Sequence, residues 1–208
     1  MPDTALAQRP PTSRPRAEVD RDFVWTLEGA TWADFQRLLE LRGERPVPRF
    51  AYLEGHLEIM SPSRSHEQIK SMLGCLIEAW CIEKDVGISP YGSWLLESKA
   101  DARGIEPDEC YVLGDDPDPQ VPDLAIEVVW TSGGVDKLEI YRNLGVREVW
   151  YWKQEKLRLY ALRDGTYEPI EHSELLPGID HELLLRFIDV RPMTRAVREL
   201  RAALRDQP

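Results

Sequence analysis

Apolar residues recur at the three- and four-residue spacing of an amphipathic helix between residues 61 and 85. Ser65 and Gln68 suit a capping box at the start of this segment. One apolar stripe then follows along a single helix face: Ile69, Met72, Leu73, Leu76, Ile77 and Trp80. The pattern predicts a long helix that packs on the core through this stripe.

Three short apolar runs follow, each bounded by Gly, Pro or Asp, which is typical of short buried strands. They lie near Ile88–Leu96, Glu106–Leu113 and Asp123–Val129, and a helix over Val135–Leu144 and a strand within residues 145–153 come after them. The element order is therefore α-β-β-β-α-β. It predicts an α/β fold of the α+β mixed-sheet type, with a helix on each side of the sheet.

Further elements flank this core. Thr31 begins a helix through residue 42, with Asp34 completing a capping box. Residues 48–60 predict a hairpin that turns at Glu54-Gly55 and covers the sheet edge, and a second hairpin turns at Asp164-Gly165.

Residues 193–205 predict a basic amphipathic C-terminal helix. Its arginines recur at helical spacing: Arg195, Arg198, Arg201 and Arg205. A solvated helix face explains them, and contact with phosphate or with a second copy of the chain is the alternative.

The 208 residues suffice for one domain with a hydrophobic core, predicted over residues 21–208. Residues 1–20 are rich in Pro and Arg, lack the apolar centre of a signal peptide and predict a disordered leader. The chain has no apolar run of the ~20 residues that span a bilayer, so we expect a cytoplasmic protein with no membrane contact.

Charge and metal-binding residue types narrow the possible functions. The three cysteines form no CxxC pair and none has zinc spacing with the four dispersed histidines, which argues against structural zinc. The net charge of −11 argues against a broad, non-specific grip on nucleic acid, but it permits a locally basic groove.

Two acids stand out because they lie in strand-like apolar runs. Asp108 is near the start of one run and Glu127 is inside the next, between Ile126 and Val128. A buried carboxylate is costly unless something pairs with it or binds it. Two of them from neighbouring strands, with Lys137 on the next helix, could hold a hard divalent cation beside an ammonium group. A structural ion pair between Glu127 and Lys137 is the alternative.

The pattern of Pro107-Asp108, Glu127 and Lys137 resembles the PD-(D/E)XK nuclease superfamily and, more closely, the bacterial Uma2 family (DUF820). The likeness covers about Thr31 to Val190 and includes YLEGHLEIMSPSRSHEQI, PDLAIEV, DKLEIYRNLGVREVWYW and LLPGI. In one departure from the superfamily pattern, Val129 occupies the position expected for lysine. Lys137 is the substitute, as is usual in this family.

The resemblance implies a restriction-endonuclease-like αβββαβ core and a metal-dependent endonuclease that hydrolyses phosphodiester bonds in DNA as a homodimer. Asp108, Glu127 and the backbone carbonyl of Val128 would hold Mg²⁺, for which Mn²⁺ can substitute. Lys137 would orient the attacking water or stabilise charge on the phosphate. A catalytically inactive module that keeps the fold and binds nucleic acid or a protein is the alternative function.

Three more residues are candidates for a supporting role. His66 and Glu67 begin the long helix, where some superfamily members carry a further acid. Glu67 would support the metal or its water and His66 would meet the scissile phosphate, unless both belong to a solvated first turn. Asp123 shares a strand face with Glu127 and is either an additional ligand or a cap at the start of the strand.

Overall fold

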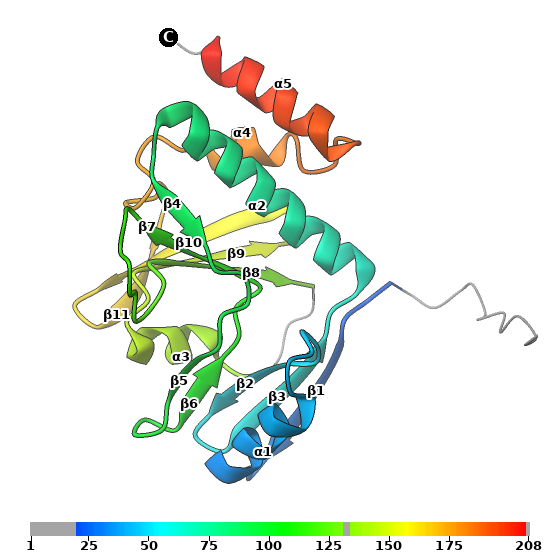
Figure 1. Ribbon diagram of the computed structural model, residues 1–208, viewed down its shortest axis with the longest axis vertical. Helices are drawn as coiled ribbons and strands as arrows, with labels where there is room; N and C mark the ends of the chain where they lie inside the picture. The colour runs from blue at the N-terminus through cyan, green and yellow to red at the C-terminus, as the bar shows by residue number, and fades with distance from the viewer. Residues whose placement is uncertain (1–19, 131–133, 207–208) are drawn as a thin grey trace, which may run out of the picture.

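The structure is a computed structural model that describes residues 20–130 and 134–206. These residues form two β-sheets and five helices, and the α/β fold with a mixed sheet is as predicted (Figure 1). Residues 1–19 of the expected leader lie outside the described residues. The Asp20 carboxylate accepts hydrogen bonds from the backbone N–H groups of Arg64 (3.1 Å) and Ser65 (3.4 Å), so Asp20 belongs to the folded part.

The predicted core is present in the six-stranded sheet. Its strand order is β11-β10-β9-β8-β7-β4, and only β8 and β9 run parallel among the pairs of this sheet. The strands are β4 (Ile88–Pro90), β7 (Glu109–Leu113), β8 (Leu124–Val129), β9 (Glu148–Lys153), β10 (Lys156–Arg163) and β11 (Thr166–Ile170). Helix α3 (Lys137–Leu144) connects β8 to β9, so α2, β4, β7, β8, α3 and β9 follow the predicted α-β-β-β-α-β order.

The second sheet has five antiparallel strands in the order β1-β3-β2-β6-β5. They are β1 (Phe23–Glu28), β2 (Arg49–Leu53), β3 (His56–Ser61), β5 (Leu96–Ser98) and β6 (Arg103–Ile105). The hairpin that turns at Glu54-Gly55 is therefore correct, but its role as an edge cover is wrong. Strand β2 pairs with β6 and strand β3 pairs with β1, so the hairpin lies inside the second, five-stranded sheet.

Helices cover both sheets (Figure 1). Helices α2 (Arg64–Lys84) and α4 (His181–Leu185) pack on one face of the six-stranded sheet, and α5 (Met193–Arg205) packs on α2. Helix α3 packs on the other face, where its buried Ile140 and Tyr141 join a cluster that includes residues of both sheets. Helix α1 (Trp32–Arg42) covers the five-stranded sheet through Phe35, and the Thr31–Asp34 capping box is as predicted.

Two predicted boundaries differ from the structure for local reasons. The run near Ile88–Leu96 divides into β4 and β5, which belong to different sheets, because the chain turns after Pro90 through Gly92 at φ 61°. The long helix begins earlier than its predicted capping box. Ser63, in an extended conformation, accepts the hydrogen bond of the His66 backbone N–H (3.1 Å) and caps it.

The C-terminal helix α5 forms as predicted, and two of its arginines bind an acid of the long helix. Arg201 and Arg205 form ion pairs with Glu83 of α2. Its apolar face buries Ala196, Leu200 and Leu204. These contacts give the two arginines a structural role. No helix of the described residues is long and apolar enough to span a membrane.

Candidate active site

Strand register brings the two predicted acids together. In the antiparallel pair β7–β8, Glu109 lies opposite Ile126, so Asp108 lies at the level of Glu127 on the neighbouring strand. The carboxylates are almost fully buried, at 1% exposure for Asp108 and 0% for Glu127. Two acids removed from water at such a position must have partners.

Asp108 has its partners on β2, α2 and β8. The Arg49 guanidinium forms an ion pair with Oδ1, and Nε2 of His66 lies 2.9 Å from the same oxygen. The backbone N–H of Val128 donates to Oδ2 over 2.7 Å. Burial alone would raise the pKa of Asp108, but the hydrogen bond and charge of His66, with the charges of Lys137 and Arg49, lower it to about 2. Asp108 is therefore ionised and already neutralised by protein cations.

His66 connects Asp108 to a third acid. Its Nδ1 lies 2.9 Å from Oδ2 of Asp22, and its side chain is fully buried. Burial alone would lower the pKa of His66, but the two carboxylates raise it to about 9. At neutral pH the Asp22–His66–Asp108 chain therefore has an imidazolium at its centre.

Glu127 has its partners on α3. Nζ of Lys137 lies 2.6 Å from Oε2, and the Tyr141 hydroxyl donates to Oε1 over 2.5 Å. Burial and the charge of Asp108 raise the pKa of Glu127, and Lys137 and Tyr141 oppose that rise. Lys137 thus reaches back from the first helical turn to the acid, as predicted, and also forms the ion pair that was its structural alternative.

Glu58 is a site residue that the sequence interpretation missed. This acid of β3 is 6% exposed; its Oε1 lies 3.9 Å from Nζ of Lys137, and its Oε2 accepts the backbone N–H of Val135 over 3.3 Å. A Cβ on Gly134, whose φ is 119°, would lie 2.1 Å from Oε2 of Glu58. Glycine is therefore required there. Glu58 thus fixes the backbone just before Lys137.

A cavity of about 270 Å³ opens beside these groups. Glu58, Val128 and Lys137 line it, and Lys153 at the end of β9 adds a second ammonium group. Within the described residues, Lys153 has no carboxylate at ion-pair distance. The acids that line the cavity are Asp22, Glu58 and Asp136, whereas Asp108 and Glu127 do not line it. Lys153 is the lining cation that none of the described carboxylates pairs with.

Comparison with protein families assigns the chain to one of them. The Uma2 family model, described as "Putative restriction endonuclease", matches residues 32–191. The chain belongs to the Uma2 family. This membership confirms the resemblance and supports a nuclease-like function.

A solved structure from Anabaena variabilis ATCC 29413, described as a putative nuclease belonging to DUF820, is also similar to the chain. The two are 13% identical with a TM-score of 0.43, and the match covers 82% of this chain and 99% of that chain. None of the curated proteins compared with the chain matches it.

The other predicted Uma2 site residues are placed differently. Glu67 reaches Asp108 only through Arg49, which contacts both acids: the Glu67 carboxylate pairs with Arg49 (2.7 Å) and with Lys70 (2.8 Å). Asp123 lies at the opposite end of β8 from the cavity, where it accepts the backbone N–H of Leu113 (2.8 Å) and pairs with Arg147 (3.0 Å). The structure places Asp123 as a cap of the strand.

The donor set suits a hard divalent cation in its chemistry. Asp108 and Glu127 supply carboxylate oxygens, and Mg²⁺ commonly takes only one or two carboxylates and keeps several waters. No group of three His, Cys, Asp or Glu side chains in residues 20–130 and 134–206 is arranged to hold a metal. Each carboxylate oxygen also has a protein partner. A cation would therefore compete with the internal partners, above all Lys137.

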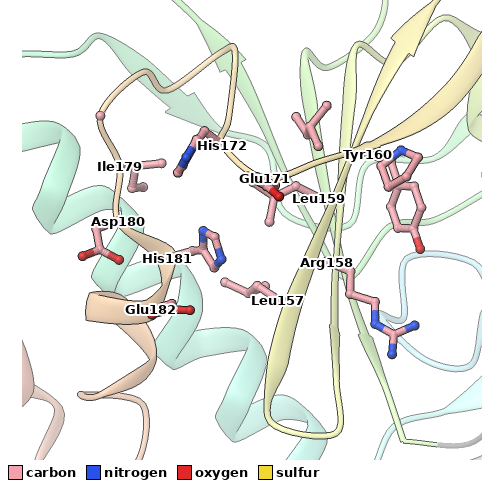
Figure 2. Close-up of a pocket in the computed structure, with 13 residues that line it drawn as sticks. Leu157, Arg158, Leu159, Tyr160, Glu171, His172, Ile179, Asp180, His181 and Glu182 are labelled. Atoms are coloured by element: carbon pink, nitrogen blue, oxygen red, sulfur yellow. The ribbon is translucent and has the colours of Figure 1, made fainter.

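A larger cavity of about 980 Å³ lies elsewhere, between the β10–β11 hairpin and the start of α4. Figure 2 shows His172 and His181 facing this space, with Arg158 turned away from them. It shares no lining residue with the cavity beside Lys137. The largest of the described cavities is therefore separate from the buried charges of Asp108, Glu127 and Lys137.

The stability of the protein should fall as the pH rises through the titration of His66. Because its pKa is raised from 6.5 to about 9, its contribution is complete below pH 6.5 and disappears as the pH rises through about 9. The loss should reach on the order of 3 kcal/mol. Urea unfolding at a series of pH values measures it, and His66→Gln should remove most of this slope. A flat wild-type profile between pH 6.5 and 9 would contradict the buried imidazolium.

Proposed function

We propose that the protein is a divalent-metal-dependent endonuclease that hydrolyses phosphodiester bonds in DNA. The observation that carries the proposal is the burial of Asp108 and Glu127 side by side, with Lys137 contacting Glu127 at a cavity. Uma2 membership supports the nuclease class. We further propose, from the family resemblance, that it acts in the cytoplasm as a homodimer.

The residues of the site have separable roles in this proposal. Asp108, Glu127 and the carbonyl of Val128 would hold Mg²⁺ or Mn²⁺, which neutralises phosphate charge and lowers the pKa of a bound water. Lys137 stabilises the charge that develops on the phosphate or orients the attacking water. Arg49 and His66 position Asp108 through their contacts with its Oδ1.

A module that keeps the nuclease fold but binds nucleic acid or protein without cleavage is the second candidate. The ion pairs that saturate Asp108 and Glu127 favour it, because a purely structural charge cluster would have the same contacts. Stabilisation by metal discriminates the two candidates, since a ligand that binds only the native state raises its stability. The melting temperature should rise with Mn²⁺ in the enzyme and stay constant in the module.

The decisive experiment incubates the protein with single- and double-stranded DNA in Mn²⁺ or Mg²⁺. We expect cleavage by the wild type and a loss of at least 100-fold in Glu127→Gln, an expectation of the order found when a group that stabilises the transition state is removed. Glu97→Gln is the matched control, because Glu97 is an exposed acid of β5 whose bond from Gln36 a glutamine can still accept. Equal cleavage by Glu127→Gln and wild type would exclude this site as the catalytic centre.

A further inference from the structure

Trp130 is the residue on which an inference about the substrate rests. It directly follows β8, three residues after Glu127, and its side chain is 44% exposed. A single exposed aromatic residue is ordinary on a protein surface, so its position is what matters.

The Trp130 ring is held against a rigid support. Trp152 of β9, only 3% exposed, contacts it edge to face, with ring centroids 5.1 Å apart and planes at 62°. Trp152 pairs with Val128 in the parallel register of β8 and β9. The exposed indole is therefore fixed next to the site before any ligand binds, which reduces the entropy cost of binding on it.

Two cavities meet at Val129 and Trp130, which line both. The first is the 270 Å³ cavity with Glu58, Lys137 and Lys153. The second, of about 620 Å³, has an apolar side formed by Ile69, Trp152, Leu185 and Ile188, and a polar side formed by Gln154, Glu155 and Asp189. Side chains alternate along β9, so Lys153 and Trp152 lie on opposite faces of the sheet. A ligand that crosses the end of β8 would thus meet a cavity with two lysines and then one whose aromatic and apolar side faces two acids. The second cavity therefore suits an uncharged base better than a phosphate.

We propose that the second cavity receives a nucleobase that adjoins the cleaved phosphodiester and stacks on Trp130, so the substrate is single-stranded or locally unpaired nucleic acid. The proposal rests on the proposed function, whose phosphate position it uses. A base inside a duplex is stacked on both sides and cannot offer a face to an indole ring. Stacking on aromatic side chains is also tolerant of sequence, because every base has a π-face.

The charge of the protein fits this mode of binding. With a net charge of −11 the chain cannot rely on broad attraction to phosphates. A stacking contact needs no excess of positive charge, and its contribution changes little with salt. Trp130 together with Lys153 would supply both parts of a nucleotide contact: an aromatic face and one cation.

The test measures binding separately from cleavage. Fluorescence anisotropy in Ca²⁺, in place of Mg²⁺, would follow a labelled oligothymidylate and a duplex of equal length. We expect the wild type to prefer the single strand, and Trp130→Ala to bind it roughly 5- to 100-fold more weakly, the range for loss of one base-stacking contact. Trp130→Phe should recover most of the affinity, because it keeps an aromatic face.

Trp25→Ala is the matched control, since Trp25 is an exposed tryptophan of β1 (57%) that lines neither cavity. It should bind as the wild type does. Unchanged binding in Trp130→Ala, an equal loss for duplex and single strand, or a wild type that binds neither would overturn the inference. Trp130-dependent binding without any cleavage in Mn²⁺ would support the inference and instead refute the nuclease proposal. Cleavage that Trp130→Ala leaves unchanged would support the nuclease proposal and refute the stacking inference.

Discussion

Lys137→Met will abolish DNA hydrolysis while increasing the stabilisation of the protein by divalent metal. Nζ of Lys137 lies 2.6 Å from Oε2 of Glu127 and would be the group that a metal must displace. Methionine keeps most of the side-chain length and the helix propensity but removes the charge. Hydrolysis should therefore fall by orders of magnitude, because the charge on the phosphate is no longer stabilised.

The metal-free Lys137→Met protein should also be less stable than the wild type. Removing one member of a buried ion pair costs about 3–5 kcal/mol in general. Protonation of Glu127, whose pKa is already raised by burial, would reduce that cost. Added Mn²⁺ should then restore stability by replacing the lost positive charge, so the metal-induced shift in melting temperature should exceed that of the wild type.

Lys153→Met is the matched control for this prediction. Lys153 lines the same cavity and has no ion-pair partner among the residues the structure describes, so its loss should leave the metal-free stability nearly unchanged. Single-turnover hydrolysis and thermal unfolding with and without Mn²⁺ measure the effects. Full hydrolysis by Lys137→Met would remove this lysine from the mechanism. An unchanged response to Mn²⁺ would show that Glu127 is not a metal ligand.

The sequence pointed to the central acids because Asp108 lies near the start of an apolar run and Glu127 interrupts the next one. Glu127 lies between Ile126 and Val128, and only a partner or a ligand makes such a burial tolerable. Lys137 followed from the family resemblance and from its place in the first turn of the next helix. These features are local, because the residues of one strand and of the helix that follows it are enough to recognise them.

The partners of those acids could not be predicted in the same way. Arg49 and Glu58 belong to a hairpin whose position depends on pairing with β1 and β6, and the sequence contains no local trace of that pairing. One signal was available: Glu58 lies between Leu57 and Ile59 in an alternating strand, as Glu127 does in its own run. A hairpin that only covers a sheet edge leaves such an acid in solvent, so the edge-cover interpretation gives Glu58 no role.

Local backbone geometry explains two further differences. Ser63 and Ser65 both fit the start of α2 by residue type, and only the extended backbone after Pro62 selects Ser63. The run near Ile88–Leu96 has the composition of one strand, but its division between two sheets depends on the turn at Gly92. Propensity therefore identified the core elements, and tertiary pairing decided their ends. The sequence patterns did not predict β1, β6 or α4; β6 and α4 are only three and five residues long, too short for a periodic pattern.

Asp108→Asn will destabilise the metal-free protein by about 3–5 kcal/mol, the usual cost of leaving a buried charge without its partner. If the site held two bare carboxylates, this substitution would relieve repulsion and preserve or raise stability. The structure shows the opposite balance at Asp108: Arg49 and His66 both contact its Oδ1. Asparagine would leave these two buried cations facing a neutral amide.

A double-mutant cycle with Arg49→Met tests this balance. Arg49→Met alone should also destabilise, but the double variant should lose less than the sum of the two, because neither partner then remains buried and alone. The free energy of unfolding in urea, followed by tryptophan fluorescence, gives the coupling. Asp123→Asn is the matched control: its partner Arg147 is 64% exposed, so its loss should cost no more than about 1 kcal/mol.

The result of this cycle also decides how the activity of Asp108 variants must be interpreted. If Asp108→Asn unfolds much of the protein, its lack of cleavage says nothing about metal binding. The double variant, with its charges balanced, should recover a stable fold and still lack the ligand. Failure of that variant to bind Mn²⁺ would then support Asp108 as a ligand. Additive losses in the cycle would instead show that Arg49 and Asp108 are not energetically coupled.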